Sequence, residues 1–288
     1  MKRFKKSKWI WVFPLLFVLS LVEFLILPPK GYIPVLMYHF IVPKPLAGST
    51  SLLMDVKKFR AQMWFLKTFG FRPISLDEFY AIKTGQLKAQ GREVVLTFDD
   101  GDRSYIESVL PVLEHYQFPS VSFVVWDYME KKMFKSINLD ELEQISKNPL
   151  VTIGSHTLTH RNLRLISIEE AHSEIFDSKK KLEEFLNKPV YYFCYPEASF
   201  NEEVAQLVQQ AGYRLSFRSS VKRFPTYPSG FYAIQRIKIH SHDNLLVFWF
   251  HVSGISTFTR KTGLIFRQLT GNKANGTLNH YEPTHNSV

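Results

Sequence analysis

Two adjacent carboxylates, Asp99 and Asp100, follow a short β-branched run and are the first candidates for chemistry in this chain. Residues Val94–Phe98, VVLTF, are typical of a buried strand, and Gly101 predicts the turn that ends it. Because side chains alternate across a strand, the two carboxylates should point in different directions, so one could hold a metal ion while the other moves a proton. Taken alone, however, an Asp-Asp-Gly sequence favours a solvated turn without function.

Two histidines in the segment Gly154–His160, GSHTLTH, have a spacing that suits one metal ion. His156 and His160 are four residues apart, so in a turn of helix both imidazoles would lie on one face. The zinc-protease signature requires Glu after the first His, and Thr157 stands there, which excludes that class. With one carboxylate, the pair would make a two-histidine, one-aspartate site for zinc or another divalent metal ion. Alternatively, the histidines only form hydrogen bonds within a polar loop.

The candidate residues lie at or near the ends of expected strands, which alternate with expected helices. The strands are expected at Ile33–Ile41, Val94–Phe98, Ser120–Trp126, Leu150–Gly154, Val190–Tyr195, Arg214–Phe217 and Ala233–Ile239. Helices are expected after Asp55, Ser75, Asn138 and Ser167, and at Tyr105–Tyr116, Asn201–Ala211 and Leu245–Phe250. This alternation predicts an α/β fold with a parallel sheet, specifically a (β/α) barrel, expected as a distorted seven-stranded TIM-like barrel behind an N-terminal transmembrane helix. In such a barrel, the carboxyl ends of the strands face the active site.

A basic cluster and an apolar run stand at the start of the chain. The run Trp9–Leu27 has 19 residues, close to the roughly 20 that a helix needs to span a bilayer, so it predicts a transmembrane signal-anchor. The five basic residues before it predict a cytoplasmic N-terminus and a catalytic domain outside the cell, held at the cell membrane in a single pass: Lys2, Arg3, Lys5, Lys6 and Lys8. The alternative is a cleaved signal peptide and a secreted protein, although no small-residue cleavage site follows.

The domain organisation expected from these patterns has three parts. Residues 1–30 form a basic tip and the membrane segment, residues 31–256 form the catalytic domain, and residues 257–288 form a polar tail that is expected to be partly disordered. With 45% hydrophobic residues, the chain can bury one large core. The single Cys194 excludes an intrachain disulfide and a Cys-rich zinc site. The net charge is +10, but no Lys/Arg stripe accompanies a nucleic-acid motif, so we expect no nucleic-acid partner.

Two motifs together resemble a known family. The segment Thr97–Gly101, TFDDG, followed by Ser155–His160, SHTLTH, closely resembles the first two motifs of the polysaccharide deacetylase (NodB-like) family of carbohydrate esterases, in order and in spacing. The similarity covers Pro34–Ile239. It implies an N-deacetylase of N-acetylglucosamine polysaccharides that uses one divalent metal ion, zinc first, with cobalt, nickel or iron as alternatives.

The resemblance also assigns roles to individual residues. It implies that Asp99 is the general base and that the metal ligands are Asp100, His156 and His160. The early LMYH sequence, which ends at His39, resembles the branch of extracellular deacetylases of β-1,6-linked poly-N-acetylglucosamine, in which the barrel is circularly permuted. By that resemblance, His39 is the general acid that protonates the departing amine.

Three further residues are candidates for the same site, on weaker sequence signals. The segment Tyr192–Ala198, YFCYPEA, resembles the family's third motif, which implies that the backbone N–H of Tyr195, beside Pro196, binds the oxyanion. His240 also follows an expected strand and is the alternative general acid. The segment departs from the family pattern at Cys194, where many members carry the Arg that orients the base.

Further departures and rival functions remain. Glu197 and Ala198 replace Tyr and Gly in the third motif, and Arg161 replaces the Pro that often follows the second His. They bear on the shape of the sugar groove more than on the metal site.

The alternative substrates are peptidoglycan and chitin-type polymers. Two other classes are a catalytically inactive wall-binding module and a two-histidine, one-carboxylate iron oxygenase, whose Asp usually follows the first His directly. Protein partners are unknown from the sequence.

Overall fold

The computed structural model describes residues 31–45, 50–133, 135–199, 201–219 and 230–254. The expected membrane segment within 1–30 and the expected tail at 257–288 lie outside these ranges. Within the described part of the chain, no helix is both long enough and apolar enough to cross a bilayer.

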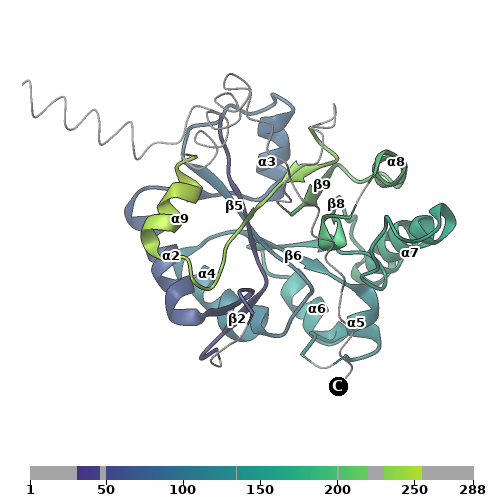
Figure 1. Cartoon of the computed structure of the whole chain (residues 1–288), viewed down its shortest axis with the longest axis horizontal. Coiled ribbons are helices and arrows are strands. Elements are labelled where there is room, and N and C mark those ends of the chain that lie inside the picture. Colours follow the sequence, from purple (N-terminus) through teal and green to yellow (C-terminus); the bar gives the residue numbers. More distant parts are fainter. Residues whose placement is uncertain (1–30, 46–49, 134, 200, 220–229, 255–288) are drawn as a thin grey trace, which may run out of the picture.

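Parallel strands form the centre of the molecule, and helices surround them (Figure 1). The main sheet runs, in spatial order, through β10 (Ile234–Gln235), β9 (Leu215–Arg218), β8 (Tyr192–Cys194), β7 (Val151–Ser155), β6 (Ser120–Val124), β5 (Glu93–Phe98), β1 (Val35–Tyr38) and β11 (Ile237–Lys238). The short strand β4 (Arg72–Pro73) pairs with the start of β5. A separate two-stranded sheet contains β2 (Phe40–Val42) and β3 (Leu53–Asp55).

One short segment brings the two edges of the main sheet together. Arg236 alone separates β10 from β11, yet β10 pairs with β9 while β11 pairs with β1. The sheet is therefore a mostly parallel, nearly closed barrel, which confirms the α/β class and the barrel architecture. Its path contains eight strands and not the seven expected, because Arg236 divides the expected strand Ala233–Ile239 in two.

The helices lie outside the barrel, with α2, α4 and α9 on one side of Figure 1 and α5, α6 and α7 on the other. Their bounds are α2 (Val56–Thr68), α3 (Leu76–Lys83), α4 (Leu110–Tyr116), α5 (Trp126–Glu130), α6 (Leu139–Ser146), α7 (Ile168–Leu186), α8 (Glu202–Gln210) and α9 (Leu245–Val252). A π-helical turn, Tyr105–Val109, precedes α4, and a 3-10 turn, Pro196–Ala198, follows β8.

Side-chain caps explain why several helices begin where the sequence predicts. Asn138 and Ser167 each accept a hydrogen bond from the backbone of the third helical residue, and the Glu at that position bonds back to the cap, so both helices start with a complete capping box. The Asp55 carboxylate likewise accepts from the Lys57 N–H at 2.7 Å. These local hydrogen bonds account for where the three helices begin.

Two expected strands end at least two residues earlier than the sequence indicates. The strand expected at Ser120–Trp126 ends at Val124, because the Trp126 N–H donates to the Thr157 carbonyl at 3.4 Å and Trp126 begins α5. The strand expected at Ile33–Ile41 ends before His39, and β2 begins after it in the second sheet. His39 therefore occupies the break between two strands.

The strand side chains divide between two apolar clusters, as expected for strands with both faces buried. Val35 of β1 and Val95 of β5 belong to one cluster, whereas their chain neighbours Leu36 and Leu96 belong to the other, which also contains residues of the surrounding helices. The first cluster includes alternate residues of β6, β8 and β9 and is the interior of the barrel. The alternation matters for chemistry because it decides which residues at the strand ends face inward.

Gly154 in β7 tests how tightly this interior is packed. A Cβ atom at position 154 would lie 2.5 Å from two ring carbons of Phe123 and 3.1 Å from the Tyr192 carbonyl oxygen. We expect Gly154→Ala to lower the free energy of unfolding by about 1–3 kcal/mol, since the ring must leave its packed position. Urea unfolding measures this. Gly230→Ala is the control, because its Cβ would meet only the end of Lys83 at 3.9 Å, and equal stability losses for both variants would contradict the tight packing.

Candidate active site

Asp99 faces the barrel interior because it continues the inward row of β5. Val95 belongs to the interior cluster, and Thr97 and Asp99 follow at the two-residue period of a strand. Asp99 is 3% exposed, and its N–H donates to the Tyr38 carbonyl at 3.1 Å, which ties it to the end of β1. The carboxylate is therefore held at the inner end of the strand and requires a buried partner.

That partner is Arg236, the residue that separates β10 from β11. Its two terminal nitrogens donate to the two oxygens of Asp99, each at 2.6 Å, in a bidentate pair. A third hydrogen bond, at 3.0 Å, joins Arg236 to the Thr97 hydroxyl. Burial by itself would raise the pKa of Asp99, but the charge and hydrogen bonds of Arg236 outweigh burial and hold this pKa well below its usual value. The carboxylate is thus ionised and fixed in orientation.

The motif pattern did not reveal Arg236 as the partner of Asp99, because Cys194 occupies the place where many family members carry the orienting Arg. The Sγ atom of Cys194 lies 3.0 Å from the same guanidinium nitrogen that binds Asp99. A small side chain on β8 thus leaves room for an Arg that arrives from the other edge of the sheet. The signal in the sequence was a single Arg inside the apolar strand pattern AIQRIKI.

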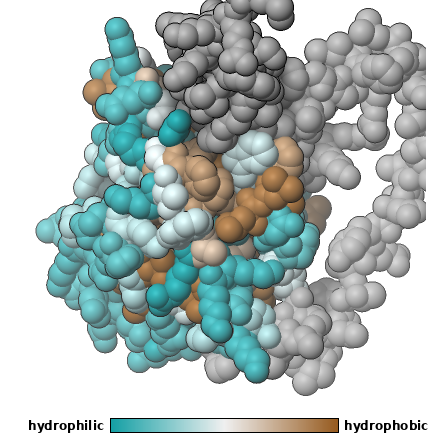
Figure 2. Space-filling model, turned by 90° about the vertical axis from the view of Figure 1, so that its left-hand side faces the viewer, coloured by the Kyte–Doolittle hydropathy of each residue, from teal (hydrophilic) through white to brown (hydrophobic). Residues whose placement is uncertain are grey.

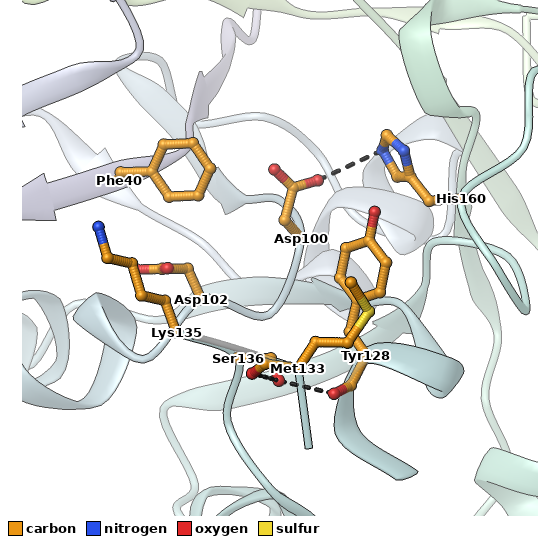
Figure 3. Close-up of a pocket in the computed structure, with 8 residues that line it drawn as sticks. All are labelled: Phe40, Asp100, Asp102, Tyr128, Met133, Lys135, Ser136 and His160. Atoms are coloured by element: carbon orange, nitrogen blue, oxygen red, sulfur yellow. Dashed lines mark hydrogen bonds and ion pairs between the residues drawn. The ribbon is translucent and has the colours of Figure 1, made fainter. Parts of the chain in front are cut away.

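Asp100 points away from Asp99 because its backbone is left-handed, with φ of 74°. Its Oδ1 atom lies 3.6 Å from Nε2 of His156 and 3.4 Å from Nε2 of His160. Figure 3 shows the carboxylate of Asp100 directed at the His160 ring. The structure therefore brings together the three residues that were predicted as one ligand set.

The histidine pair converges by a different route from the one predicted. Residues 156–160 form a loop and not a turn of helix, because Thr157 and His160 are left-handed, with φ of 73° and 66°. The His160 N–H donates to the Thr157 hydroxyl at 3.0 Å inside this loop. The expected helical turn was wrong, although the two rings still meet with centroids 4.9 Å apart.

The surroundings of His156 prepare its outer nitrogen for a metal ion. Its Nδ1 donates to the Cys194 carbonyl at 2.8 Å, which leaves Nε2 as the nitrogen with a free lone pair. Burial lowers the pKa of His156 to about 4, so the ring is neutral at physiological pH, as a ligand must be.

Among the residues that the structure describes, two overlapping groups of side chains could hold a metal ion: Asp100 with His156 and His160, and Asp99 with His156 and Cys194. The first group fits better. Two ligands that are each 2.0–2.1 Å from a tetrahedral zinc ion lie about 3.3 Å apart, close to the observed separations of 3.4 and 3.6 Å. In the second group, both Asp99 oxygens are already bound by Arg236.

Of the two histidines proposed as proton donor, His39 lies with the carboxylates. Its Nε2 is 3.9 Å from Oδ2 of Asp99. Burial lowers the pKa of His39, and Asp99 and Asp100 only partly oppose this, so its protonated form is a stronger acid than free histidine. The side-chain contacts of His240 are instead with Ser51, at 3.1 Å, and with the ring of His242.

The predicted oxyanion donor is already engaged. The Tyr195 N–H donates to the Phe217 carbonyl at 2.9 Å, which extends the pairing of β8 with β9. Tyr195 and the neighbouring Pro196 are both buried. The prediction that this N–H binds an oxyanion is therefore contradicted in this structure, because a ladder hydrogen bond uses the donor.

A pocket of about 300 Å³ opens beside the ligand set. Asp100 and His160 form one wall, and Phe40, Tyr128 and Met133 add apolar surface (Figure 3). Its remaining lining residues are Asp102, Lys135 and Ser136. The pocket thus reaches two of the three proposed ligands, Asp100 and His160, whereas Asp99 is not among its lining residues.

Comparison with known proteins agrees with this geometry. The family model described as "Polysaccharide deacetylase" matches residues 86–216, which include both carboxylates and both histidines of the site. A relative from Bacillus subtilis (strain 168), YxkH, whose name assigns it to the polysaccharide deacetylases, is 25% identical over 207 residues, covering 72% of this chain and 71% of its own.

Two other proteins are similar over different shares of their length. The poly-beta-1,6-N-acetyl-D-glucosamine N-deacetylase of Escherichia coli (strain K12) is 25% identical over 143 residues, which are 45% of this chain but only 21% of that protein. The solved structure of the Streptococcus pyogenes deacetylase PplD in complex with acetate has a TM-score of 0.69 and 23% identity, covering 76% of this chain and 97% of the other. This structural similarity supports the assignment of the fold alone.

The pair of Asp99 and Arg236 makes a testable prediction about stability. We expect Arg236→Met to cost about 3–5 kcal/mol of unfolding free energy, because it leaves a buried carboxylate without its cation. Adding Asp99→Asn to that variant should recover part of the loss. Urea unfolding of both single variants and the double variant measures the coupling, and strictly additive losses would contradict the ion pair.

Proposed function

The chain belongs to the polysaccharide deacetylase family, and from this premise we propose that it removes N-acetyl groups from N-acetylglucosamine units of an extracellular polysaccharide by metal-dependent hydrolysis. The observation that carries the proposal is the convergence of two carboxylates with different partners. Asp99 is bound by Arg236, and Asp100 faces two imidazole nitrogens. An amide hydrolase needs these two functions, a base and an electrophilic centre, side by side.

The metal ion is assigned to Asp100, His156 and His160. Three protein ligands leave a coordination position open, which is typical of catalytic and not of structural zinc sites. A divalent ion held there would act as a Lewis acid toward the acetamide oxygen and would make the attacking water more acidic. Zinc suits this donor set, and cobalt, nickel or iron would suit it as well.

Asp99 and His39 divide the proton transfers. Asp99 is ionised, so it can accept a proton as water attacks the acetamide carbon. Arg236 keeps the carboxylate in one orientation during this transfer. His39, 3.9 Å from Asp99, is placed to give a proton to the nitrogen as the C–N bond breaks. Because an amine is a poor leaving group unless it is protonated, the reaction to acetate and amine requires this acid.

For the polymer, we propose β-1,6-linked poly-N-acetylglucosamine. The LMYH sequence that ends at His39 supports this choice, as does the similarity to the Escherichia coli enzyme named for that substrate. We also propose that Trp9–Leu27 anchors the chain in the cell membrane with residues 31–256 outside the cell, because the run is apolar and follows a basic cluster.

The choice of polymer predicts a difference in rate. Acetate release from β-1,6-linked N-acetylglucosamine oligomers should exceed release from β-1,4-linked oligomers of the same length. A coupled acetate assay with both series and the same added metal ion measures the ratio. Faster release from the β-1,4 series would redirect the proposal to peptidoglycan or chitin-type polymers.

The roles of general base and metal ligand predict different effects of substitution on bound metal. Asp99→Asn should lower kcat by about 10²-fold or more while bound metal stays near one ion per chain, because the metal ligands remain. His160→Ala should lose both bound metal and activity, since two ligands hold an ion poorly. Metal content by elemental analysis, together with acetate release, separates the two variants. A wild-type chain that binds metal but releases no acetate from any oligomer would indicate an inactive binding module.

The placement of the two candidate acids predicts which one acts. His39→Ala should lower kcat by about 10²-fold or more, because no other proton donor in the described part of the chain is assigned to the leaving nitrogen. His240→Ala should leave kcat within about twofold, because His240 contacts Ser51 and His242 instead of the carboxylates. Steady-state acetate release measures both. The reverse order of effects would move the acid role to His240.

A further inference from the structure

The loop that carries His156 and His160 is held by one buried carboxylate on another element. Glu174 lies in α7 and is 4% exposed. Its Oε2 accepts hydrogen bonds from the N–H groups of Leu158 at 3.0 Å and Thr159 at 2.8 Å. Its Oε1 accepts a hydrogen bond from the Thr159 hydroxyl. We propose that Glu174 is a positioning residue that sets the metal affinity of this loop, an inference that rests on the proposed metal site.

The conformation of the loop explains why it needs such support. Thr157 and His160 both have positive φ values, which residues other than glycine adopt only when their surroundings enforce them. Left without external contacts, the loop would relax, and the two imidazoles would separate. Glu174 binds the two residues that lie between these left-handed positions, so it acts at the centre of the strained segment.

The hydrogen-bond partners of the Glu174 carboxylate fit a role in positioning the loop. Within the described part of the chain, its carboxylate contacts neutral donors and has no ion pair. A buried carboxylate is costly unless donors satisfy it, and it presents only acceptors to them. The Leu158 N–H also approaches the main-chain carbonyl of Glu174 at 3.1 Å, so the side chain matters most for Thr159.

The test measures metal binding by the full chain, independent of catalysis. Zinc affinity is obtained by competition with a chromophoric chelator for Glu174→Ala, Glu174→Gln and Thr159→Val. Asp177→Ala is the matched control, because Asp177 is an exposed acidic residue on the same helix. Glutamine can still accept from the two N–H groups with its oxygen and donate to the Thr159 hydroxyl with its amide, so Glu174→Gln removes the charge while keeping the hydrogen bonds.

We expect Glu174→Ala to weaken zinc binding by about 10–100-fold, as for other groups that orient metal ligands, with Glu174→Gln and Thr159→Val in between and Asp177→Ala unchanged. Zinc-induced increases in Tm should follow the same order. Unchanged zinc affinity in folded Glu174→Ala, or in the two milder variants if Glu174→Ala does not fold, overturns the inference. If the wild-type chain itself does not bind zinc, the proposed metal site fails and not only the role of Glu174.

A second inference concerns the outer face of α2 and α9, which lie side by side in Figure 1. Four exposed residues of α2 are basic, namely Lys57, Lys58, Arg60 and Lys67, and the exposed Trp64 has 50% of its surface accessible. The helix itself contains no acidic residue, although Asp55 caps it. On α9, Leu245 and Leu246 are 38% and 57% exposed. Figure 2, which views this side, shows hydrophobic surface gathered among hydrophilic residues. Cationic and aromatic side chains beside exposed leucines are typical of a surface that meets anionic lipid headgroups.

The start of the described chain lies at the same face. The Tyr32 hydroxyl donates to the His251 carbonyl, at the end of α9, at 3.5 Å. Four residues lie between Tyr32 and Leu27, the end of the expected membrane segment, and the five steps along the chain span at most about 18 Å. We infer that the α2–α9 face rests on an anionic bilayer surface.

Amide hydrogen exchange of the full chain in lipid vesicles tests this docking. α2 and α9 should exchange more slowly in vesicles of phosphatidylcholine with phosphatidylglycerol than in phosphatidylcholine alone, and added salt should remove the difference. Charge reversal on α2 should abolish the protection: Lys57→Glu, Arg60→Glu and Lys67→Glu. The matched control reverses three exposed lysines near α6 and α7 and should keep it: Lys147→Glu, Lys180→Glu and Lys188→Glu.

Two results would overturn the docking proposal. Equal exchange in both kinds of vesicle removes the anionic surface as partner, and protection that rises with protein concentration without lipid shows that a second copy covers the face. Failure of the full chain to float with vesicles of either composition would instead contradict the membrane anchor itself.

Discussion

The buried ion pair between Asp99 and Arg236 is the interaction on which the rest of the site depends. It joins the end of β5 to the residue that separates β10 from β11. A carboxylate or a guanidinium alone would be strongly disfavoured in the barrel interior, so each can be buried only with the other. The contact that orients the proposed base therefore lies where the two edges of the sheet meet. The proposed catalytic site and the closure of the barrel both depend on this pair of side chains.

Strand geometry then separates two neighbouring carboxylates into two roles. The two-residue period of β5 turns Asp99 inward beside Thr97, and the left-handed backbone of Asp100 turns the next carboxylate toward the imidazoles and the pocket. Arg236 holds Asp99 away from metal ligation, which leaves the neutral His156 free to act with Asp100. One dipeptide can thus supply a base and a ligand without the two carboxylates competing for the same ion.

Local signals in the sequence were sufficient for the alternating elements and the capped helix starts, whereas the grouping of Asp100 with His156 and His160 came from the resemblance of two motifs to a known family. The contacts that the sequence could not predict are those between distant segments. Arg236 meets Asp99 across 137 positions, and only the meeting of the sheet edges brings them together. The helical turn expected at residues 156–160 failed because periodicity does not reveal left-handed residues, and the Tyr195 donor failed because strand pairing used its N–H.

The central claim is that a divalent ion binds Asp100, His156 and His160 while Asp99 stays with Arg236. Anomalous diffraction from crystals grown with zinc tests it most directly. The account predicts one peak within bonding distance of Oδ1 of Asp100 and of both Nε2 atoms, with the Asp99–Arg236 pair intact. A peak between Asp99, His156 and Cys194, with Arg236 displaced, would contradict it.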